Sequence, residues 1–321
     1  MSGIEIGLLG LAVMLVLMLI RIPIAIAMMA VGLGGYSLLA GVDPALNYLK
    51  TGAFWRFSSY DLAIIPMFLL MGEFAAGAGL SNSLFKAANA FFGHRRGGMA
   101  VSVIGACAGF GAICGSSLAT VSTMTRVALP ELRSAGYSLP LATGALAAGG
   151  TLGILIPPSV ALVIYAIIVE ANIVALFAAA MIPALFAAIG FMLAIEVYIR
   201  LVPNASPKGI RFSWGERGRA VLDTWTTLLI FLLVIGGIYI GWFTPSEAAA
   251  VGVFGTGLLA FTKGKMRWPG FSDAILRTAR ATAMIFLIIL GAEFLNSFLA
   301  LTRVSYIMAE TIQASGLSPY L

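Results

Sequence analysis

The sequence is poor in charged residues, in histidine and in cysteine. Only 10% of its 321 residues are charged, with one histidine and two cysteines, whereas soluble domains carry about 25% charged residues. Hydrophobic residues make up 60% of the chain, and several apolar runs approach the roughly 20 residues that cross a bilayer. The shortage of charge therefore excludes an ordinary soluble protein and predicts an all-α integral membrane protein.

Few side chains are suited to enzyme chemistry. His94 is the only histidine and lies in a loop-like stretch, so Ser116 lacks a base for an intramembrane serine protease. No apolar run contains the pair of aspartates that a membrane aspartyl protease needs. Cys107 and Cys114 share one apolar stretch without metal-binding spacing, and we expect buried thiols there. The sequence therefore predicts no enzyme activity and no bound cofactor.

The basic residues indicate the membrane topology. The net charge of +6 is spread over short linkers and forms no patch for nucleic acid. Backbone groups in lipid must be hydrogen-bonded internally, so the apolar runs are expected to be helices. These runs cover residues 4–20, 22–40, 61–80, 97–125, 139–170, 173–199, 221–242, 247–262 and 282–301. By the positive-inside rule, the basic linkers at 95–96, 200–219 and 263–267 face the cytoplasm, and the N-terminus lies outside.

The run at 97–125 is predicted to be a re-entrant hairpin. It has arginines on both sides, so both of its ends should face the cytoplasm. These are Arg95, Arg96, Arg126 and Arg133. Its middle, Gly109 to Ser117, carries the glycines and hydroxyls that a hairpin tip requires. We predict a hairpin over 97–135; the alternative is one long tilted helix whose small residues serve packing.

The run at 139–170 is predicted to be broken near the middle of the bilayer. Pro157 and Pro158 are adjacent, and paired prolines cannot continue a helix. A break frees carbonyl oxygens that coordinate cations and helix ends that attract anions. Hydroxyls at both interruptions add oxygens suited to Na⁺, from Ser116, Ser117, Thr151 and Ser159. The alternative interpretation is a kink that serves only packing.

The sequence contains a weak internal repeat. Pro245 follows Pro23 by 222 residues, and Gly291 follows Gly72 by 219, each within a similar local sequence. By the charge topology the two copies face opposite ways, which is typical of secondary transporters. The second copy ends early, so we expect that roughly 100 residues of a complete repeat lie outside this chain.

Three acidic residues near apolar runs have different interpretations. Glu73 and Glu293 are costly in a membrane, and each is either a proton or ion ligand or a helix cap near an interface. Glu247 follows Thr244 by three residues and is expected to be an acidic residue in the first turn of a helix.

Three motifs resemble the large, DctM-like subunit of tripartite ATP-independent periplasmic (TRAP) transporters. They are CGSSLAT at 114–120, GGTLGILIPPSV at 149–160 and GIYIGWFTPSEAAA at 237–250. The resemblance covers essentially the whole chain. It implies an elevator-type secondary transporter of the bacterial inner membrane, in which a Na⁺ gradient drives symport of an organic anion such as a C4-dicarboxylate or a sugar acid. It also implies two partners, a small DctQ-like membrane subunit and a periplasmic substrate-binding protein.

The resemblance also implies the ion sites. In the family, each Na⁺ site joins one hairpin tip to one broken span of the other repeat. The positions that match here are Gly115, Ser116 and Ser117 at the first tip, and Thr151, Gly153, Pro157, Pro158 and Ser159 at the first broken span. The second hairpin and second proline pair are missing from this sequence. Each site would then be half built, so we expect a fragment or a chain that does not transport as it stands.

Four regions follow from the repeat and the resemblance. Residues 1–60 would hold scaffold spans and an outer interfacial arm, and residues 61–199 the first transport-domain half, with its broken span at 139–170. Residues 200–281 would hold further scaffold spans and an inner arm, and 282–321 the incomplete start of the second transport half. The amphipathic stretches 44–60 and 268–281 are the expected arms.

Two alternatives to this function remain open. One is a stand-alone secondary transporter that couples anions to Na⁺ on a related inverted-repeat scaffold, which interaction with a binding protein would distinguish. The other is an inactive fragment.

Overall fold

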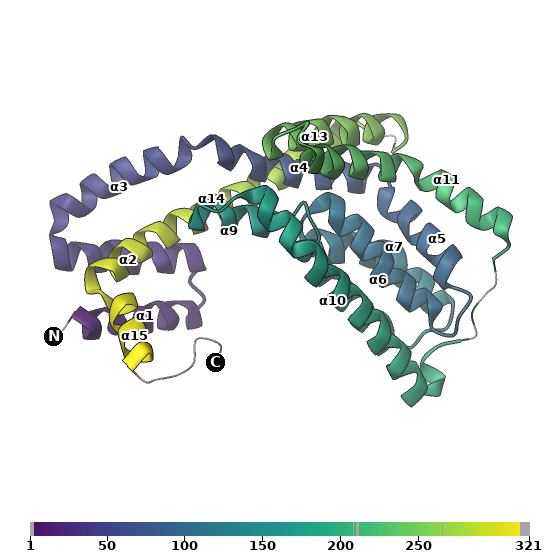
Figure 1. Ribbon diagram of the computed structural model, residues 1–321, viewed down its shortest axis with the longest axis horizontal. Coiled ribbons are helices and arrows are strands. Elements are labelled where there is room, and N and C mark those ends of the chain that lie inside the picture. The colour runs from purple at the N-terminus through teal and green to yellow at the C-terminus, as the bar shows by residue number, and fades with distance from the viewer. Residues whose placement is uncertain (1–2, 208, 210–211, 265, 315–321) are drawn as a thin grey trace. The chain divides into compact units, whose positions relative to one another are not determined.

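A computed structural model describes residues 3–207, 209, 212–264 and 266–314 (Figure 1). The regular elements in these residues are all helices, which confirms the all-α class. The chain divides into two compact units, one of residues 1–60 with 280–321 and one of residues 61–279.

Helices long and apolar enough to cross a membrane are present in the described part of the chain. Four continuous helical stretches meet this condition, at Tyr60–Gly77, Ile173–Leu201, Trp214–Ile240 and Trp268–Thr302. A fifth span arises if Leu139–Leu155 and Val160–Val169, which are bent by 40° at their junction, count as one. The chain is therefore a multi-pass membrane protein, as its composition predicts.

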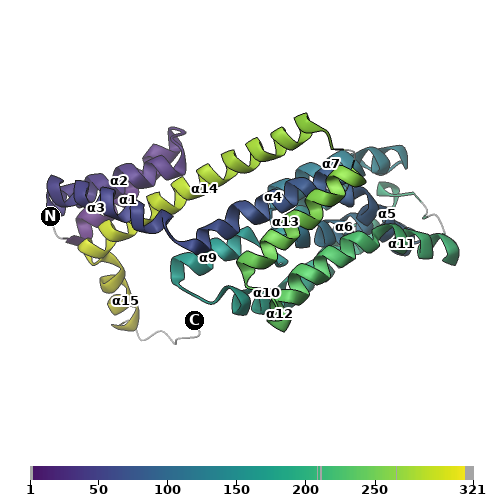
Figure 2. The ribbon, with the colours of Figure 1, turned by 90° about the horizontal axis from the view of Figure 1, so that it is seen from above.

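The larger unit is a bundle built around α6 and α8. Its elements are η1 (Tyr60–Ala63), α4 (Ile64–Gly77), α5 (Leu80–Phe92), α6 (Gly98–Cys114), α7 (Ser117–Ser134), α8 (Leu139–Leu155), α9 (Val160–Val169), α10 (Ile173–Leu201), η2 (Pro203–Ala205), α11 (Trp214–Phe231), η3 (Leu232–Gly236), α12 (Gly237–Ile240) and α13 (Pro245–Thr262). Helices α6 and α7 pack against each other and against α8, and α5 covers α6. Helix α13 lies along α4 (Figure 2).

The smaller unit packs glycine-rich helices around two phenylalanines. Its helices are α1 (Gly3–Leu19), α2 (Ile24–Ala40), α3 (Val42–Phe57), the C-terminal part of α14 (Trp268–Thr302) and α15 (Val304–Ala314). Phe294 and Phe298 of α14 are each only 1% exposed. Side chains on Gly32 and Gly35 of α2 would collide with Phe294 and Phe298, so these glycines allow the close packing.

The structure corrects two expected boundaries. The inner arm at 268–281 and the span at 282–301 form one 35-residue helix, α14. The change from amphipathic to apolar sequence alters the surroundings of the helix but contains no proline that would end it. The run expected from 221 begins earlier, because Ser213 and Glu216 form a capping box that starts α11 at Trp214.

Several local predictions are confirmed. Cys107 and Cys114 are free thiols and both are buried. His94 is exposed in the turn between α5 and α6. Glu247 lies in the first turn of α13, where it forms a capping box with Thr244.

The packing of α2 on α14 gives a paired prediction. A Cβ on Gly32 would lie 2.6 Å from the backbone nitrogen of Leu295, whereas a Cβ on Gly34 would meet no atom within 4 Å. Gly34→Ala should leave the free energy of unfolding unchanged or raise it by about 0.5–1 kcal/mol, the usual gain over glycine in a helix. Gly32→Ala should lower it by roughly 1–3 kcal/mol through overpacking.

Melting temperatures of the two variants in detergent test this pair. The account requires Gly32→Ala to melt below the wild type and below Gly34→Ala. Equal melting temperatures for the two variants would contradict the packing.

Candidate functional site

The first interruption is a tight turn between α6 and α7. Gly115 ends α6 in the left-handed conformation (φ 61°), with its N–H donating to Gly111 O at 2.8 Å. Ser116 starts α7 as its N-cap, and its hydroxyl accepts from the N–H of Ala119 at 3.4 Å. A glycine that ends one helix and a serine that begins the next are the residues that favour these two positions.

The second interruption is the junction of α8 and α9. Pro157 and Pro158 lie in it and are buried, and neither has an N–H with which to extend α8. Ser159 is fully buried and holds the two helix ends together. Its hydroxyl donates to Ile154 O at 2.6 Å, and its oxygen accepts from the N–H of Leu162 at 3.3 Å. The break is therefore capped on both sides by one side chain.

The two interruptions contact each other. The N–H of Val160, at the start of α9, donates to Gly115 O at 3.2 Å. This backbone hydrogen bond links the first residue after one break to the turn of the other. We call this contact, with Gly115, Ser116, Gly153, Pro158 and Val160, the crossing.

Glycines make the crossing possible. A Cβ on Gly115 would lie 2.6 Å from Pro158 O, and a Cβ on Gly153 would lie 2.9 Å from Ser116 O. A Cβ on Gly111 would lie 2.6 Å from the Cα of Gly153. Real Cβ atoms do not approach backbone this closely, so three glycines let the backbones of α6, the turn and α8 touch.

The remaining predicted site residues differ in their exposure and in their hydrogen bonds. Ser117 is the first residue of α7, is partly exposed, and its hydroxyl has no hydrogen-bond partner among the described residues. Thr151 is exposed on α8, and its hydroxyl donates to Ala148 O at 2.7 Å, along its own helix. The structure thus brings Gly115, Ser116, Gly153 and Pro158 together directly, while the hydroxyl hydrogen of Thr151 is used within its helix.

One buried residue at the crossing was missed as a site residue. Thr120 is fully buried, and its hydroxyl lies 2.8 Å from Ser116 O and 3.0 Å from the sulfur of Cys114. The four-residue spacing from Ser116 to Thr120 is the available sequence signal, because a threonine hydroxyl often bonds the carbonyl one turn earlier. The turn is also shorter than the expected stretch Gly109 to Ser117, since α6 continues to Cys114.

A hydrogen bond also joins the start of α6 to the linker between α7 and α8. The hydroxyl of Tyr137, between α7 and α8, accepts from the N–H of Met99 at the start of α6, at 3.2 Å. Burial raises the pKa of the Tyr137 hydroxyl above its usual value. Tyr137 therefore remains a neutral phenol that ties the start of α6 to the linker before α8.

Four helix ends meet at the crossing. The C-terminal ends of α6 and α8 supply carbonyl oxygens, and the N-terminal ends of α7 and α9 supply N–H groups. Carbonyls at a helix C-terminus favour a cation, and amides at an N-terminus favour an anion. No cluster of three or more histidine, cysteine, aspartate or glutamate side chains occurs in the described residues. Any cation held here would be bound by neutral oxygens, which suits a hard monovalent ion.

Glu73 and Glu293 each form an ion pair. Glu73 of α4 accepts from Arg277 Nε at 2.8 Å. Glu293 of α14 pairs with Arg56 of α3 and accepts a hydrogen bond at 3.5 Å from the Tyr48 hydroxyl. Both glutamates lie inside helices, which excludes the alternative that they cap helix ends and leaves the alternative of a proton or ion ligand as a prediction.

The two ion pairs are related by the sequence repeat. Glu293 follows Glu73 by 220 residues, and Arg277 follows Arg56 by 221. Each pair joins the arm arginine of one repeat to the span glutamate of the other. The repeated spacing extends the weak sequence match to side-chain partners, which supports the internal repeat.

Comparison with known proteins places these features in a family. The family model for the tripartite ATP-independent periplasmic transporter DctM component matches residues 11–321. The chain is 33% identical to the C4-dicarboxylate TRAP transporter large permease protein DctM of Pseudomonas aeruginosa, over 90% of this chain and 67% of that protein. It is 31% identical to the ectoine TRAP transporter large permease protein TeaC of Halomonas elongata, over 96% of this chain and 71% of that protein. It is 28% identical to the sialic acid TRAP transporter large permease protein SiaM of Vibrio cholerae, over 83% of this chain and 62% of that protein.

The crossing predicts how one buried thiol responds to an added methyl group. A Cβ on Gly153 would lie 2.6 Å from the Thr120 hydroxyl, which contacts Cys114, whereas a Cβ on Gly144 of the same helix would meet no atom within 4 Å. Gly153→Ala should therefore displace Thr120 and expose Cys114 to N-ethylmaleimide, as read by peptide mass spectrometry. Gly144→Ala should leave Cys114 unlabelled, and continued protection of Cys114 in Gly153→Ala would refute the close packing.

The exposure of the ion pairs predicts a ranking of their coupling energies. These energies are measured in double-mutant cycles in which the arginine, the glutamate or both are replaced by glutamine. The Arg56 and Glu293 side chains are 26% and 23% exposed, Arg277 and Glu73 are 57% and 25% exposed, and the intrahelical pair Arg200 and Glu196 are 75% and 41% exposed. Less screening should give the Arg56 pair the largest coupling, above about 1 kcal/mol, and the Arg200 pair about 0.3–0.5 kcal/mol. Thermal unfolding of the single and double variants measures these values. A coupling for Arg56–Glu293 no larger than that of Arg200–Glu196 would contradict the stronger coupling that its lower exposure predicts.

Proposed function

The chain belongs to the DctM family of tripartite ATP-independent periplasmic transporters, and from this premise we propose that it imports a small organic anion by Na⁺ symport. The crossing of the two interrupted helices is the observation that carries the proposal. It joins the two interruptions of the first repeat, whereas the resemblance led us to expect each site to pair interruptions of different repeats. It brings the C-terminal ends of α6 and α8, which bear carbonyl oxygens, next to the N-terminal ends of α7 and α9, which bear the Ser116 and Ser159 hydroxyls. Such breaks are where secondary transporters bind their coupling ions.

Na⁺ is the ion that this oxygen set favours. Carbonyl and hydroxyl groups are hard neutral ligands, and soft or borderline metals prefer thiolate and imidazole. The thiols of Cys107 and Cys114 are buried, and the Cys114 thiol shares a hydrogen bond with the Thr120 hydroxyl. The ion would be cargo that enters with the solute. Its oxygen ligands would come from Ser116 and Ser117 in the turn and from Gly153 and Ser159 in the broken helix.

The relatives support a substrate class. They are named for C4-dicarboxylate, ectoine, sialic acid and isethionate; the first three solutes carry a carboxylate group and the fourth a sulfonate. We therefore propose a small organic anion as the solute, with dicarboxylates and sugar acids as first candidates.

Partners and location follow from the family. A tripartite transporter of this kind needs a small DctQ-like membrane subunit and a periplasmic binding protein that delivers the solute. We accordingly propose the bacterial inner membrane as its location. The amphipathic helices that carry Arg56 and Arg277 would brace a moving transport domain in an elevator-type cycle.

Thermal melting in NaCl and in KCl at equal ionic strength tests the ion site. A ligand that binds only the folded state stabilises it by about 2.7 kcal/mol at a hundredfold excess over its Kd. The chain should therefore melt at a higher temperature in NaCl. Ser117→Ala should reduce this difference without lowering the melting temperature in KCl, because the Ser117 hydroxyl has no other partner among the described residues.

Ser134→Ala is the matched control for this test. Ser134 lies at the other end of α7, where its hydroxyl donates to Glu131 O on the same helix at 2.9 Å. It should keep the full difference between Na⁺ and K⁺. Equal melting temperatures in the two salts for the wild-type chain would overturn the assignment of Na⁺ to the crossing.

A further inference from the structure

A second polar feature of the larger unit lies beside the crossing. A cavity of about 560 Å³ opens between α4, α5, α7 and the N-terminal part of α14. Helix α7 contributes Ala119, Ser122, Thr123 and Arg126. Their spacing places them on one face of the helix, directed at the cavity.

The cavity contains polar side chains that the protein leaves unbonded. Ser81, Asn82, Ser122, Thr123 and Arg126 line it, and none of these side chains has a hydrogen-bond partner or ion pair in the described part of the chain. Asn82, Ser122 and Arg126 are exposed, whereas Ser81 is only 2% exposed and Thr123 only 7%. Because the protein supplies none of them with a partner, these polar groups are free to bond a polar ligand in the cavity.

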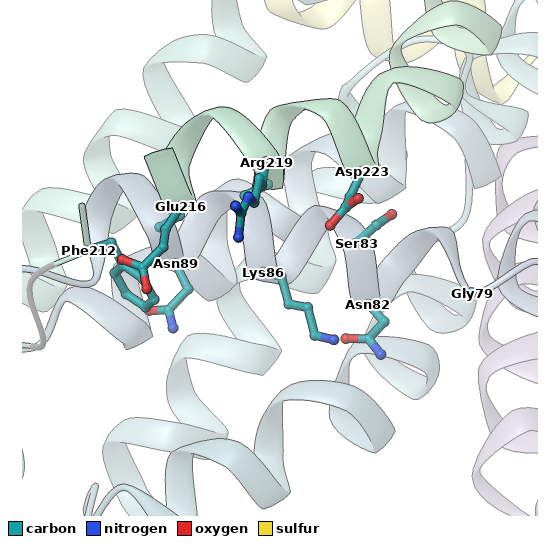
Figure 3. A pocket seen from close by; sticks show the side chains of 11 residues that line it. Gly79, Asn82, Ser83, Lys86, Asn89, Phe212, Glu216, Arg219 and Asp223 are labelled. Carbon is teal, nitrogen blue, oxygen red and sulfur yellow. The ribbon is translucent and has the colours of Figure 1, made fainter. Parts of the chain in front are cut away.

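The charge of the cavity is positive. Glu73 and Arg277 also line it and neutralise each other in their ion pair. Arg126 adds a positive charge for which the described residues supply no carboxylate. The adjacent cavity between α5 and α11, about 460 Å³ in volume, differs in this respect (Figure 3). There Lys86 of α5 and Arg219 of α11 line the cavity together with Glu216 and Asp223 of α11, so the charges balance.

One end of the cavity reaches the crossing. Gly72 lines the cavity, and a Cβ on Gly72 would lie 2.7 Å from the Cβ of Cys114, the last residue of α6. Ala119, also in the lining, donates its N–H to the Ser116 hydroxyl. An anion in the cavity would therefore lie along α7 from the turn that the proposed Na⁺ site uses.

We propose that this cavity binds the carboxylate group of the transported solute, with Arg126 as its charge partner and Thr123 as a hydrogen-bond donor. The proposal rests on the function proposed above and names the residues that recognise the solute. Arginine presents paired N–H groups that match the two oxygens of a carboxylate. Its position beside the ion site would place the charges of solute and Na⁺ close together.

A cysteine probe in the cavity tests its charge without any transport. Ser122→Cys adds a reactive thiol, and both native cysteines are buried. A negatively charged methanethiosulfonate should modify Cys at 122 faster than a positively charged one. Adding Arg126→Gln should shift that rate ratio by roughly tenfold toward the positive reagent, whereas Arg126→Lys should preserve it. An unchanged ratio in Arg126→Gln would overturn the role of Arg126.

Protection by an added anion tests the ligand. Succinate should slow modification of Ser122→Cys severalfold, and it should have no such effect after Arg126→Gln or on the exposed control Ser134→Cys at the other end of α7. Equal protection by inorganic phosphate and by every carboxylate in a panel of succinate, sialic acid and ectoine would overturn a solute site in favour of a general anion site, as would no protection by any of the three.

The result is separable from the proposed ion coupling. Protection by a carboxylate without a Na⁺-specific rise in melting temperature would support the cavity and contradict Na⁺ symport. A Na⁺-specific rise without protection would support the ion site and overturn the cavity proposal.

Discussion

The hydrogen bond from Val160 N–H to Gly115 O is the contact on which the larger unit depends. Two helices end and two begin within a few residues of it, and each end leaves backbone groups that lipid cannot satisfy. The Ser116 and Ser159 side chains cap the N-termini of α7 and α9, and the Ser159 hydroxyl also donates a hydrogen bond to Ile154 O. The glycines at 111, 115 and 153 let the backbones approach closely enough for this exchange. Without them the broken helices would expose unpaired polar groups inside the membrane.

The same contact brings together the neutral oxygens that we propose as ligands of a small cation, in a chain that is poor in charge. The charges that remain have separate tasks. Glu73 and Glu293 are held by arginines of the arm segments, with a spacing that repeats along the chain. Arg126 lacks such a partner among the described residues and faces a cavity next to the turn. Charge balance thus separates the residues that hold the fold from the residue that we propose binds solute.

Much of this arrangement was predictable from the sequence, because it depends on backbone chemistry. Adjacent prolines and a glycine-serine pair mark the two interruptions, and arginines on both sides of 97–125 indicate a hairpin. The partners were not predictable. Thr120, the contact of Gly111 with Gly153, and the pairing of Arg56 with Glu293 depend on packing between segments far apart in the chain, which single-sequence patterns do not encode. The continuous helix α14 was not predicted either, because the amphipathic stretch 268–281 and the apolar stretch 282–301 differ in polarity but form one helix.

The central claim is that the two interruptions form one unit that Na⁺ holds together. Hydrogen–deuterium exchange of the purified chain in NaCl and in KCl tests it most directly, read on peptides that cover 111–120 and 153–162. If the claim is right, Na⁺ slows exchange in both peptides by a similar factor, because opening one break frees the other, while a peptide around Gly144 is unchanged. Slower exchange in only one of the two peptides, or in neither, would contradict it.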